Sequence, residues 1–444
     1  MISRLRQHLA SPDLPAQLGK LAAGAPASAP VSLTLELGSL TTDWLTALPA
    51  DVPFWYLARP THGLHQLGIG HALHVASAGA NRFAALDSAF SGFARHWRHN
   101  GTPLAFCGFA FDEHSQAPLP NALLAIPAIL LESRDGNCRA TLSVPAGKID
   151  CAPAHWAQLL ARPLPLHAQP RLPPAERTLA DRAWVARVNA ALRDIADGRF
   201  AKVVLCRNLR FTADRPLCAG TLLGRLIEQQ AAGLIYAHGH GSTVFLGATP
   251  ERLVRLAGRQ IATDALAGTA WPGSLDIESP KNRHEQSLVV RAILAALESD
   301  CIRPPQAGPV EVQSAGNLRH LRSPITGEAA AGVSLFDLLR AVHPTPAVGG
   351  FPRPAALDWL ARHGEQRSAW YSGGLGSITP QGDGEFSVAL RSALIRGSDI
   401  ELQAGAGIVS GSDAQLELAE TDAKIGTLLA ALSDQAKRAH GRLA

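Results

Sequence analysis

Three charged residues near the C-terminal end of the chain could act on a small anionic molecule. A helix is predicted over 412–432, where Glu417, Glu420 and Lys424 take positions i, i+3 and i+7 and therefore share one face. Such a row is commonly a solvated stripe with an internal ion pair. The alternative is that the two carboxylates are hard oxygen ligands for Mg²⁺ and that the lysine binds an anion beside the metal.

A glycine-rich turn comes directly before this helix and favours the second alternative. Gly405 and Gly407 flank Ala406 in the segment QAGAGIV. Because glycines leave backbone N–H groups open to close approach, a loop of this kind before a helix can hold a carboxylate. The pattern is weak by itself, since Gly-Ala-Gly occurs in many turns.

A lysine begins an otherwise apolar strand earlier in the chain. The strand predicted over 202–211 has the sequence KVVLCRNLRF, and its alternation puts Lys202 on the same side as Val204 and Cys206. If that side is internal, the lysine is partly desolvated. Burial of this kind lowers the pKa of a lysine and can make it a base near neutral pH.

Two glutamates stand at the ends of predicted elements. Glu251 follows Pro250 where the strand of FLGATPERL ends, which is a suitable place for a functional carboxylate. Glu285 lies in the charged entry to a helix predicted over 278–297. Each glutamate is a weak signal when taken alone, because a single carboxylate at such a position is more often at the surface.

A cluster of histidines is better explained by a hairpin than by a metal site. His62, His65, His71 and His74 fall in one short stretch, but the stretch alternates and no Cys or carboxylate is interleaved. The sequence also contains no phosphate-binding Walker loop, no dinucleotide-binding GxGxxG after a strand and no GxSxG nucleophile elbow.

The elements that must position these residues follow the hydrophobic pattern. Besides the two helices above, helices are predicted over 179–195 and 334–339, and strands over 243–246, 254–256 and 386–395. Shorter apolar runs before residue 163 also indicate strands. We predict an α+β protein with large, mainly antiparallel sheets and helices packed outside.

A proline-rich stretch divides the chain. Five prolines between Pro163 and Pro174 remove backbone donors and block helix formation, so the stretch is predicted to be an extended crossover. We therefore distinguish residues 1–175, a divergent N-terminal part, from residues 176–444, the region that carries the candidate chemistry.

The composition excludes several classes of protein. Of 444 residues 46% are hydrophobic and 18% are charged, which is typical of a globular chain, and the net charge of +4 includes no basic run of the kind that binds nucleic acid. The most apolar stretch, 123–131, is broken by Pro127 and too short to span a membrane, and the first residues lack a signal-peptide core. The six scattered cysteines include no CxxC pair, which indicates a reducing compartment. We expect a cytoplasmic protein.

Taken together, the chemical segments form an ordered series. In chain order they are KVVLCR, FLGATPERL, TDALAGT, SPKNRHEQ, HPTPAVGGFP, WYSGGLG, FSVALRSALI and AGAGIVSGSDAQLELAETDAK. The series covers about Ala183 to Leu432 and resembles the chorismate-binding family, which includes anthranilate, aminodeoxychorismate, salicylate and isochorismate synthases. The resemblance implies one fold of two large antiparallel sheets with helices outside, whose two parts the proline-rich crossover joins.

Within this family, a few positions point to conversion of chorismate to isochorismate. By resemblance, Lys202 is the general base on the water that attacks C2, and Glu251 is the general acid on the departing C4 hydroxyl. Ala267 stands in TDALAGT where some aminodeoxychorismate synthases carry a nucleophilic lysine, which argues against an amine-transferring covalent route. The form HPTPA is typical of isochorismate synthases.

The resemblance also assigns the remaining site residues. It implies that Mg²⁺ is held by three carboxylates and bridges to the ring carboxylate of chorismate, and that further side chains and amides bind anionic groups. The implied metal ligands are Glu285, Glu417 and Glu420. The implied substrate-binding residues are His343, Thr345, Tyr371, Arg391, Gly405, Ala406, Gly407, Lys424 and Ala267.

Four positions depart from the usual family motifs. Gln286 replaces a histidine, which puts a supporting role of that residue in doubt, while Thr249, Ser372 and Ala414 are small changes. Two alternatives stay open. One is a salicylate synthase, which would also eliminate pyruvate, and the other is a chorismate-binding protein without catalysis. The resemblance implies a monomer with no glutamine amidotransferase subunit.

Overall fold

The structure is a computed structural model that describes residues 1–39, 44–115, 118–161, 163–164, 166–173, 177–274 and 276–432. Pro165 and Pro174 of the proline-rich stretch, the boundary at 175/176 and the last residues, 433–444, lie outside the described residues. Residues 166–173 contain neither helix nor strand, as expected for an extended crossover. No helix in the described ranges is both long and apolar enough to cross a membrane.

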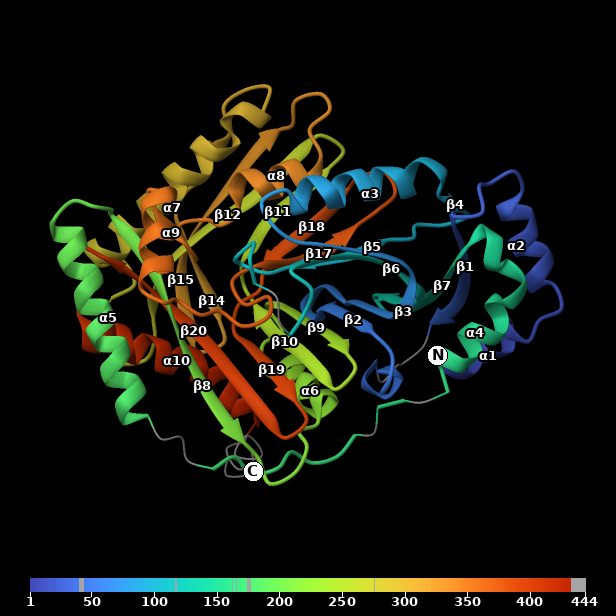
Figure 1. The fold of residues 1–444 in the computed structure, drawn as a ribbon, viewed down its shortest axis with the longest axis horizontal. Coiled ribbons are helices and arrows are strands. Elements are labelled where there is room, and N and C mark those ends of the chain that lie inside the picture. The colour runs from blue at the N-terminus through green and yellow to red at the C-terminus, as the bar shows by residue number, and fades with distance from the viewer. Residues whose placement is uncertain are drawn as a thin grey trace.

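Helices and strands before the crossover form one end of the molecule (Figure 1). They are α1 (Ile2–Leu9), α2 (Leu14–Ala22), β1 (Pro30–Ser39), β2 (Phe54–Arg59), β3 (Leu64–Ser77), α3 (Arg82–His96), β4 (Arg98–His99), β5 (Ala105–Phe109), β6 (Ala122–Arg134), β7 (Asn137–Pro145) and α4 (Ala152–Leu159).

Elements after the crossover form the rest and carry most of the candidate residues. They are α5 (Thr178–Ala196), β8 (Lys202–Thr212), α6 (Ala219–Gln229), β9 (Leu234–His240), β10 (Thr243–Thr249), β11 (Arg252–Ala257), β12 (Gln260–Ala270), α7 (Pro280–Leu297), β13 (Gln306–Ala307), β14 (Glu311–Ala315), β15 (Leu318–Glu328), α8 (Leu335–Val342), β16 (Gly350–Phe351), α9 (Arg353–Arg362), β17 (Gly374–Ile378), β18 (Gly384–Val388), β19 (Ser392–Arg396), β20 (Asp399–Val409) and α10 (Ala414–Leu432).

The strands form two antiparallel series that meet at β6. One series runs β8–β20–β19–β10–β9–β2–β3–β6, and the other runs β15–β12–β11–β18–β17–β5–β6. The first half of β6 pairs with β5 and its second half with β7, and the two pairings separate around Pro127, which has no N–H to donate. The α+β class with mainly antiparallel strands is therefore confirmed, and in the described part of the chain the two series are continuous.

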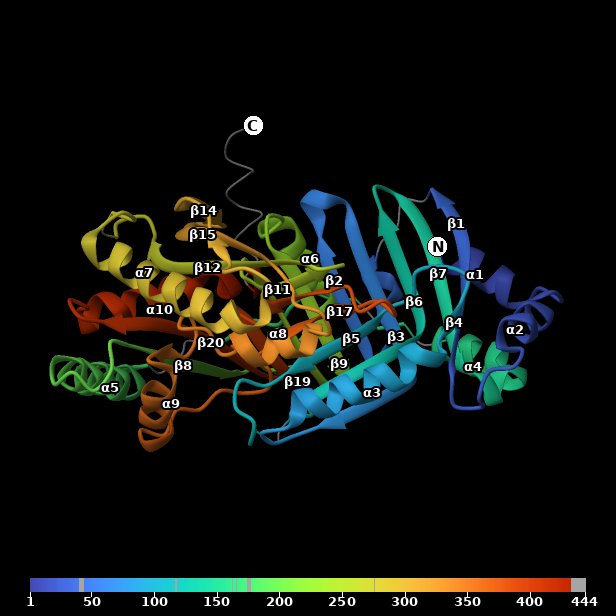
Figure 2. The ribbon, with the colours of Figure 1, turned by 90° about the horizontal axis from the view of Figure 1, so that it is seen from above.

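Helices cover the outer faces of this assembly. Figures 1 and 2 agree that α1, α2 and α4 lie at one end and α5, α7, α9 and α10 at the other. Odd-numbered residues of β8, such as Val203 and Leu205, pack with Trp184 of α5 and Trp359 of α9. Because side chains alternate along a strand, the even-numbered residues of β8 face the interior between the two series.

One predicted strand is wrong in its extent. The segment 386–395 is two strands, β18 and β19, and the chain turns between them at Arg391, whose φ is 49°. A residue with a side chain rarely adopts this left-handed conformation, and it ends a strand pairing where it occurs. The sequence pattern missed the break because apolar residues continue on both sides of it.

Candidate active site

A cavity lies between the two series of strands and collects most of the candidate residues. From the first series it is lined by Val204 to Cys206 of β8 and by residues 403–405 and 407 of β20; from the second, by residues 266–269 of β12 and by His320 of β15. Nine of the predicted site residues line it: Glu251, Ala267, Glu285, Tyr371, Arg391, Gly405, Gly407, Glu420 and Lys424.

Lys202 is fully buried at the start of β8, beneath the cavity. The strand alternation places it on the same side as Val204 and Cys206, which line the cavity. Its Nζ lies 2.9 Å from Oε1 of Glu285, and this ion pair joins β8 to α7. The amine therefore lies against Glu285, which lines the cavity.

Glu251 is a buried carboxyl at the turn between β10 and β11. It is 3% exposed, and its backbone N–H donates to Thr249 Oγ1 at 3.2 Å, so the threonine at this position supports the turn. Burial raises the pKa of Glu251 from its ordinary 4.5 to about 8, and the nearby Asp264 adds to the rise while Lys202 opposes it. A carboxylic acid that stays protonated at neutral pH can donate a proton in the cavity.

The three predicted metal ligands are each paired with a lysine. Glu285 pairs with Lys202 as above, Glu420 Oε1 lies 2.7 Å from Lys424 Nζ, and Glu417 Oε1 lies 2.5 Å from the Nζ of a third lysine, Lys281 of α7. All three carboxylates are buried. Burial alone would raise the pKa of Glu285, but the three lysines lower it below its ordinary value.

These carboxylates have the donor chemistry that Mg²⁺ requires. The cation prefers carboxylate oxygens, and Glu417 has a buried oxygen, Oε2, without a hydrogen-bond partner. Burial and the like charge of Glu420 raise the pKa of Glu417 to about 7, although the charge of Lys281 opposes the rise. In the present arrangement no three Asp, Glu, His or Cys side chains of the described ranges converge as an ion site.

Groups suited to binding an anion also line the cavity. Arg391 is buried at the break between β18 and β19, and burial lowers its pKa to about 10, still well above neutral. Its Nη1 donates to the Ala315 carbonyl at 3.2 Å. Lys424 Nζ donates to the Gly405 carbonyl at 2.8 Å, so that one ammonium connects α10 to β20.

Three predicted substrate-binding residues do not line the cavity. Ala406 faces the opposite side of β20 and packs in the core with α5 and α9, because neighbouring residues of a strand alternate. His343 donates from Nε2 to the Ser372 carbonyl at 3.1 Å, and Thr345 is buried; neither residue lines the cavity. From the same segment Ala347 and Val348 reach the cavity instead. Glu417 of α10, one of the three metal-ligand candidates, is also absent from the lining residues.

Two lining residues were missed by the sequence analysis. The Nε2 atom of His320, in β15, lies 2.7 Å from Arg391 Nη2, and its Nδ1 atom lies 3.1 Å from the Gly268 carbonyl oxygen. Burial and the positive charge of Arg391 lower the pKa of His320 well below its ordinary value. A neutral imidazole that donates to Gly268 can accept from Arg391 and orient the guanidinium. No helix or strand is predicted over residues 318–328, so the sequence offered no signal for this histidine.

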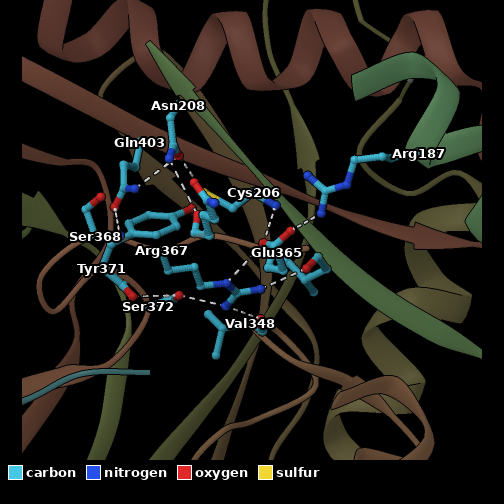
Figure 3. Close-up of polar contacts among 12 residues, drawn as sticks. Arg187, Cys206, Asn208, Val348, Glu365, Arg367, Ser368, Tyr371, Ser372 and Gln403 are labelled. Atoms are coloured by element: carbon cyan, nitrogen blue, oxygen red, sulfur yellow. Dashed lines mark hydrogen bonds and ion pairs between the residues drawn. The ribbon is translucent and has the colours of Figure 1, made fainter. Parts of the chain in front are cut away.

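The second missed residue, Arg367, connects the segments around the cavity (Figure 3). Its guanidinium donates to the Val348 carbonyl and the Ser372 hydroxyl, both at 2.7 Å, and to the Val204 carbonyl at 2.8 Å. Oε1 of Glu365 lies 3.1 Å from Nε of Arg367 and also accepts a hydrogen bond from the Cys206 N–H at 2.7 Å. Ser372 thus has a defined role as an acceptor for the arginine.

Gln286, which stands where the family motif has histidine, is also a supporting residue. It is buried on α7, and its Nε2 donates to the Ala265 carbonyl at 3.0 Å and to Ser323 Oγ at 3.1 Å. These bonds fix the first turns of α7 against β12 and β15. The amide therefore positions the helix that carries Glu285.

Comparisons with known proteins give one family match and several similar chains. Residues 25–433 match the family model described as chorismate binding enzyme. The salicylate biosynthesis isochorismate synthase of Pseudomonas aeruginosa is 35% identical over 398 residues, 82% of each chain. Isochorismate synthase MenF of Bacillus subtilis is 34% identical over 57% of this chain and 56% of its own. The structure of the menaquinone-specific isochorismate synthase of Escherichia coli matches with a TM-score of 0.79 at 25% identity, over 95% of this chain and 99% of that one.

Proposed function

This chain belongs to the chorismate-binding enzyme family, and from that premise we propose that it is an isochorismate synthase, an isomerase that converts chorismate to isochorismate. The observation that carries the proposal is the environment of Glu251. A buried carboxyl with a pKa of about 8 faces a cavity that also contains Arg391 and Lys424. Such a site can bind a dianion and protonate a leaving hydroxyl on it.

The reaction exchanges a hydroxyl at C2 of the ring for the one at C4. Lys202 takes a proton from the attacking water, and Glu251 gives a proton to the departing C4 hydroxyl. The ring double bonds shift as the new C–O bond forms and the old one breaks, so that no covalent enzyme intermediate is needed. Arg391 and Lys424 bind carboxylates of the substrate. The guanidinium of Arg391 offers two parallel donors to a carboxylate, and the ammonium of Lys424 offers a compact positive charge.

Magnesium belongs to the same proposal. Glu285, Glu417 and Glu420 would hold the ion, which would supply positive charge for the ring carboxylate of chorismate. The support is the buried, unpartnered oxygen of Glu417 together with the carboxylates beside it. Glu285 would connect the metal to the base, since its Oε1 lies 2.9 Å from Lys202 Nζ.

Product analysis tests the proposal directly. Purified protein with chorismate and Mg²⁺ should form isochorismate without pyruvate, as followed by chromatography with mass detection. Chelation by EDTA should stop turnover, and added Mg²⁺ should restore it. Lys202→Ala, with its fold checked by circular dichroism, is the matched inactive variant.

Two results would contradict the assignment in different ways. Salicylate together with pyruvate would identify a salicylate synthase. Unchanged chorismate with every metal tried would identify a binding protein without catalysis. Full activity in EDTA would remove the metal from the mechanism while leaving the isomerisation in place.

A further inference from the structure

Lys281 of α7 is a cation inside the carboxylate cluster to which the proposed reaction gives no role. Its Nζ lies 2.5 Å from Glu417 Oε1, and the two residues join the start of α7 to the start of α10. Lys281 precedes Glu285 by four residues, so both project from one face of α7. The ammonium thus lies among the same carboxylates that would bind Mg²⁺.

The two partners of this ion pair differ in their freedom to move. The side chain of Glu417 is 2% exposed, whereas that of Lys281 is 20% exposed. Glu417 is also held from the other side, since Ser412 Oγ donates to its Oε1 at 2.7 Å. Lys281 has a long, flexible stem and a route to water. If the pair separates, the lysine is therefore the partner that leaves.

Lys281 and Mg²⁺ would compete for the carboxylate of Glu417. Mg²⁺ binds carboxylate oxygens at about 2.0–2.1 Å and tolerates little distortion of its octahedral shell. An ammonium 2.5 Å from Oε1 would lie close to an ion bound at the free Oε2 of the same carboxylate and would repel it. Without either cation, the buried charge of Glu417 would lack a partner, which is costly in the protein interior.

We propose that Lys281 is the resident counter-ion of the metal site: it neutralises Glu417 in the metal-free protein and is displaced into solvent when Mg²⁺ binds. The inference rests on the metal site of the proposed function. It adds a residue that limits the affinity for the metal and stabilises the metal-free state. Lys202 and Lys424 differ from Lys281 in that they pair with Glu285 and Glu420 and have roles toward water and substrate.

Calorimetric titration of the full-length protein with MgCl₂ alone tests this inference. Lys281→Met should bind Mg²⁺ more tightly than the wild type by at least about tenfold, the lower end for a close charge pair. Lys281→Arg, which keeps the charge, should not bind more tightly. Arg283→Met is the matched control, because it removes an exposed charge from the same helix, and its affinity should equal that of the wild type.

Thermal unfolding gives an independent readout. Metal-free Lys281→Met should unfold at a lower temperature than metal-free wild type, and Mg²⁺ should raise its unfolding midpoint by more than it raises that of the wild type. A crystal structure of the wild type with Mg²⁺ should have Lys281 Nζ beyond hydrogen-bond distance of Glu417. This structure needs no variant, so it decides the question even if Lys281→Met fails to fold.

The contrary results separate the two proposals. Equal or weaker binding of Mg²⁺ by Lys281→Met, or a Lys281–Glu417 pair retained beside a bound ion, would overturn the counter-ion role alone. A wild type that binds no Mg²⁺ would overturn both this role and the metal part of the proposed function. Isochorismate formation in the product assay would stand in either case.

Discussion

At the scale of single residues, the site works by giving chemically similar groups different surroundings. Glu251 and Glu285 are both buried glutamates, yet burial raises the pKa of Glu251 to about 8 while three lysines lower that of Glu285. One carboxyl therefore keeps its proton and can act as an acid, and the other stays ionised and can bind cations. Neighbouring charges, more than residue type, assign the two roles.

The pH dependence of turnover should report the Glu251 carboxyl. Because its pKa is raised to about 8, the proton it donates is present at pH 7 and is lost as the pH rises through 8. In the wild type kcat/KM should fall above about pH 8. Glu251→Gln should lower the rate by roughly 10²- to 10⁴-fold, the contribution of general acid catalysis, and should lack this alkaline limb.

The comparison is made on initial rates across a series of buffers at constant ionic strength. Circular dichroism of Glu251→Gln provides the control for folding. If the variant keeps the wild-type rate, or if its residual activity declines over the same pH range as the wild type, another group is the acid.

At the scale of elements, β20 sets how closely the two sides of the site approach. Its alternation turns Gly405 and Gly407 toward the cavity and Ala406 toward the helices. A Cβ on Gly407 would lie 2.3 Å from Glu285 Oε1 and 2.9 Å from Lys202 Cε. Close packing against Glu285 and Lys202 therefore requires glycine at this position. Anion binding by its N–H is not needed to explain the glycine.

Gly407→Ala should consequently damage catalysis more than folding. The methyl group displaces Glu285 and Lys202, and a shift of about 1 Å in such a site can lower kcat/KM by roughly 10²-fold. Steady-state kinetics with chorismate measure the loss, and thermal unfolding should place the midpoint near that of the wild type.

Gly92→Ala is the matched control for this substitution. Gly92 is an exposed residue of α3, and a Cβ there would meet nothing within 4 Å. The variant should keep full activity and gain about 0.4–1 kcal/mol of stability from the reduced freedom of its unfolded chain. Normal activity of Gly407→Ala would show that Lys202 and Glu285 tolerate displacement.

At the scale of the whole molecule, one core joins the two ends of the chain. Leu5 and Leu18 of the N-terminal helices belong to the same buried cluster as Ile425 and Leu428 of α10. Strand β2 also pairs with β9, and β5 with β17, so that segments from both sides of the proline-rich crossover share hydrogen bonds. The N-terminal part therefore supports the helix that carries Glu417 and Glu420.

Removal of a core side chain far from the cavity should test this continuity. Leu18 is fully buried, and Leu18→Ala should lower the free energy of unfolding by about 2–5 kcal/mol, the usual cost of a cavity in a core. Urea unfolding followed by tryptophan fluorescence and circular dichroism measures it. Leu428→Ala should shift the same transition.

Leu179→Ala provides the control, because Leu179 is 82% exposed and its loss should change stability by less than about 0.5 kcal/mol. Separate transitions shifted by Leu18→Ala and by Leu428→Ala would mean that the N-terminal helices unfold as an independent unit.

Sequence reasoning predicted the fold class, the extended crossover, most of the described helices after it and some of the strands, because periodicity reflects which side of an element is buried. It also proposed Lys202, Glu251 and the three other glutamates, because their residue types in that order already suggest a reaction. It missed the break at Arg391, the outward direction of Ala406 and the place of His343 outside the cavity. The direction in which the chain turns depends on φ at one residue, and the direction of a side chain depends on strand register. Local sequence patterns encode neither.

The sequence by itself determined which chemical groups are available and on which elements they lie. Only the tertiary structure decided which of them meet: Lys281 with Glu417, His320 with Arg391, and Arg367 with three segments around the cavity. The physical reason is that most of these contacts join residues from elements distant in the chain. Their charges and hydrogen bonds acquire a role only when packing of the two strand series brings them together and excludes water.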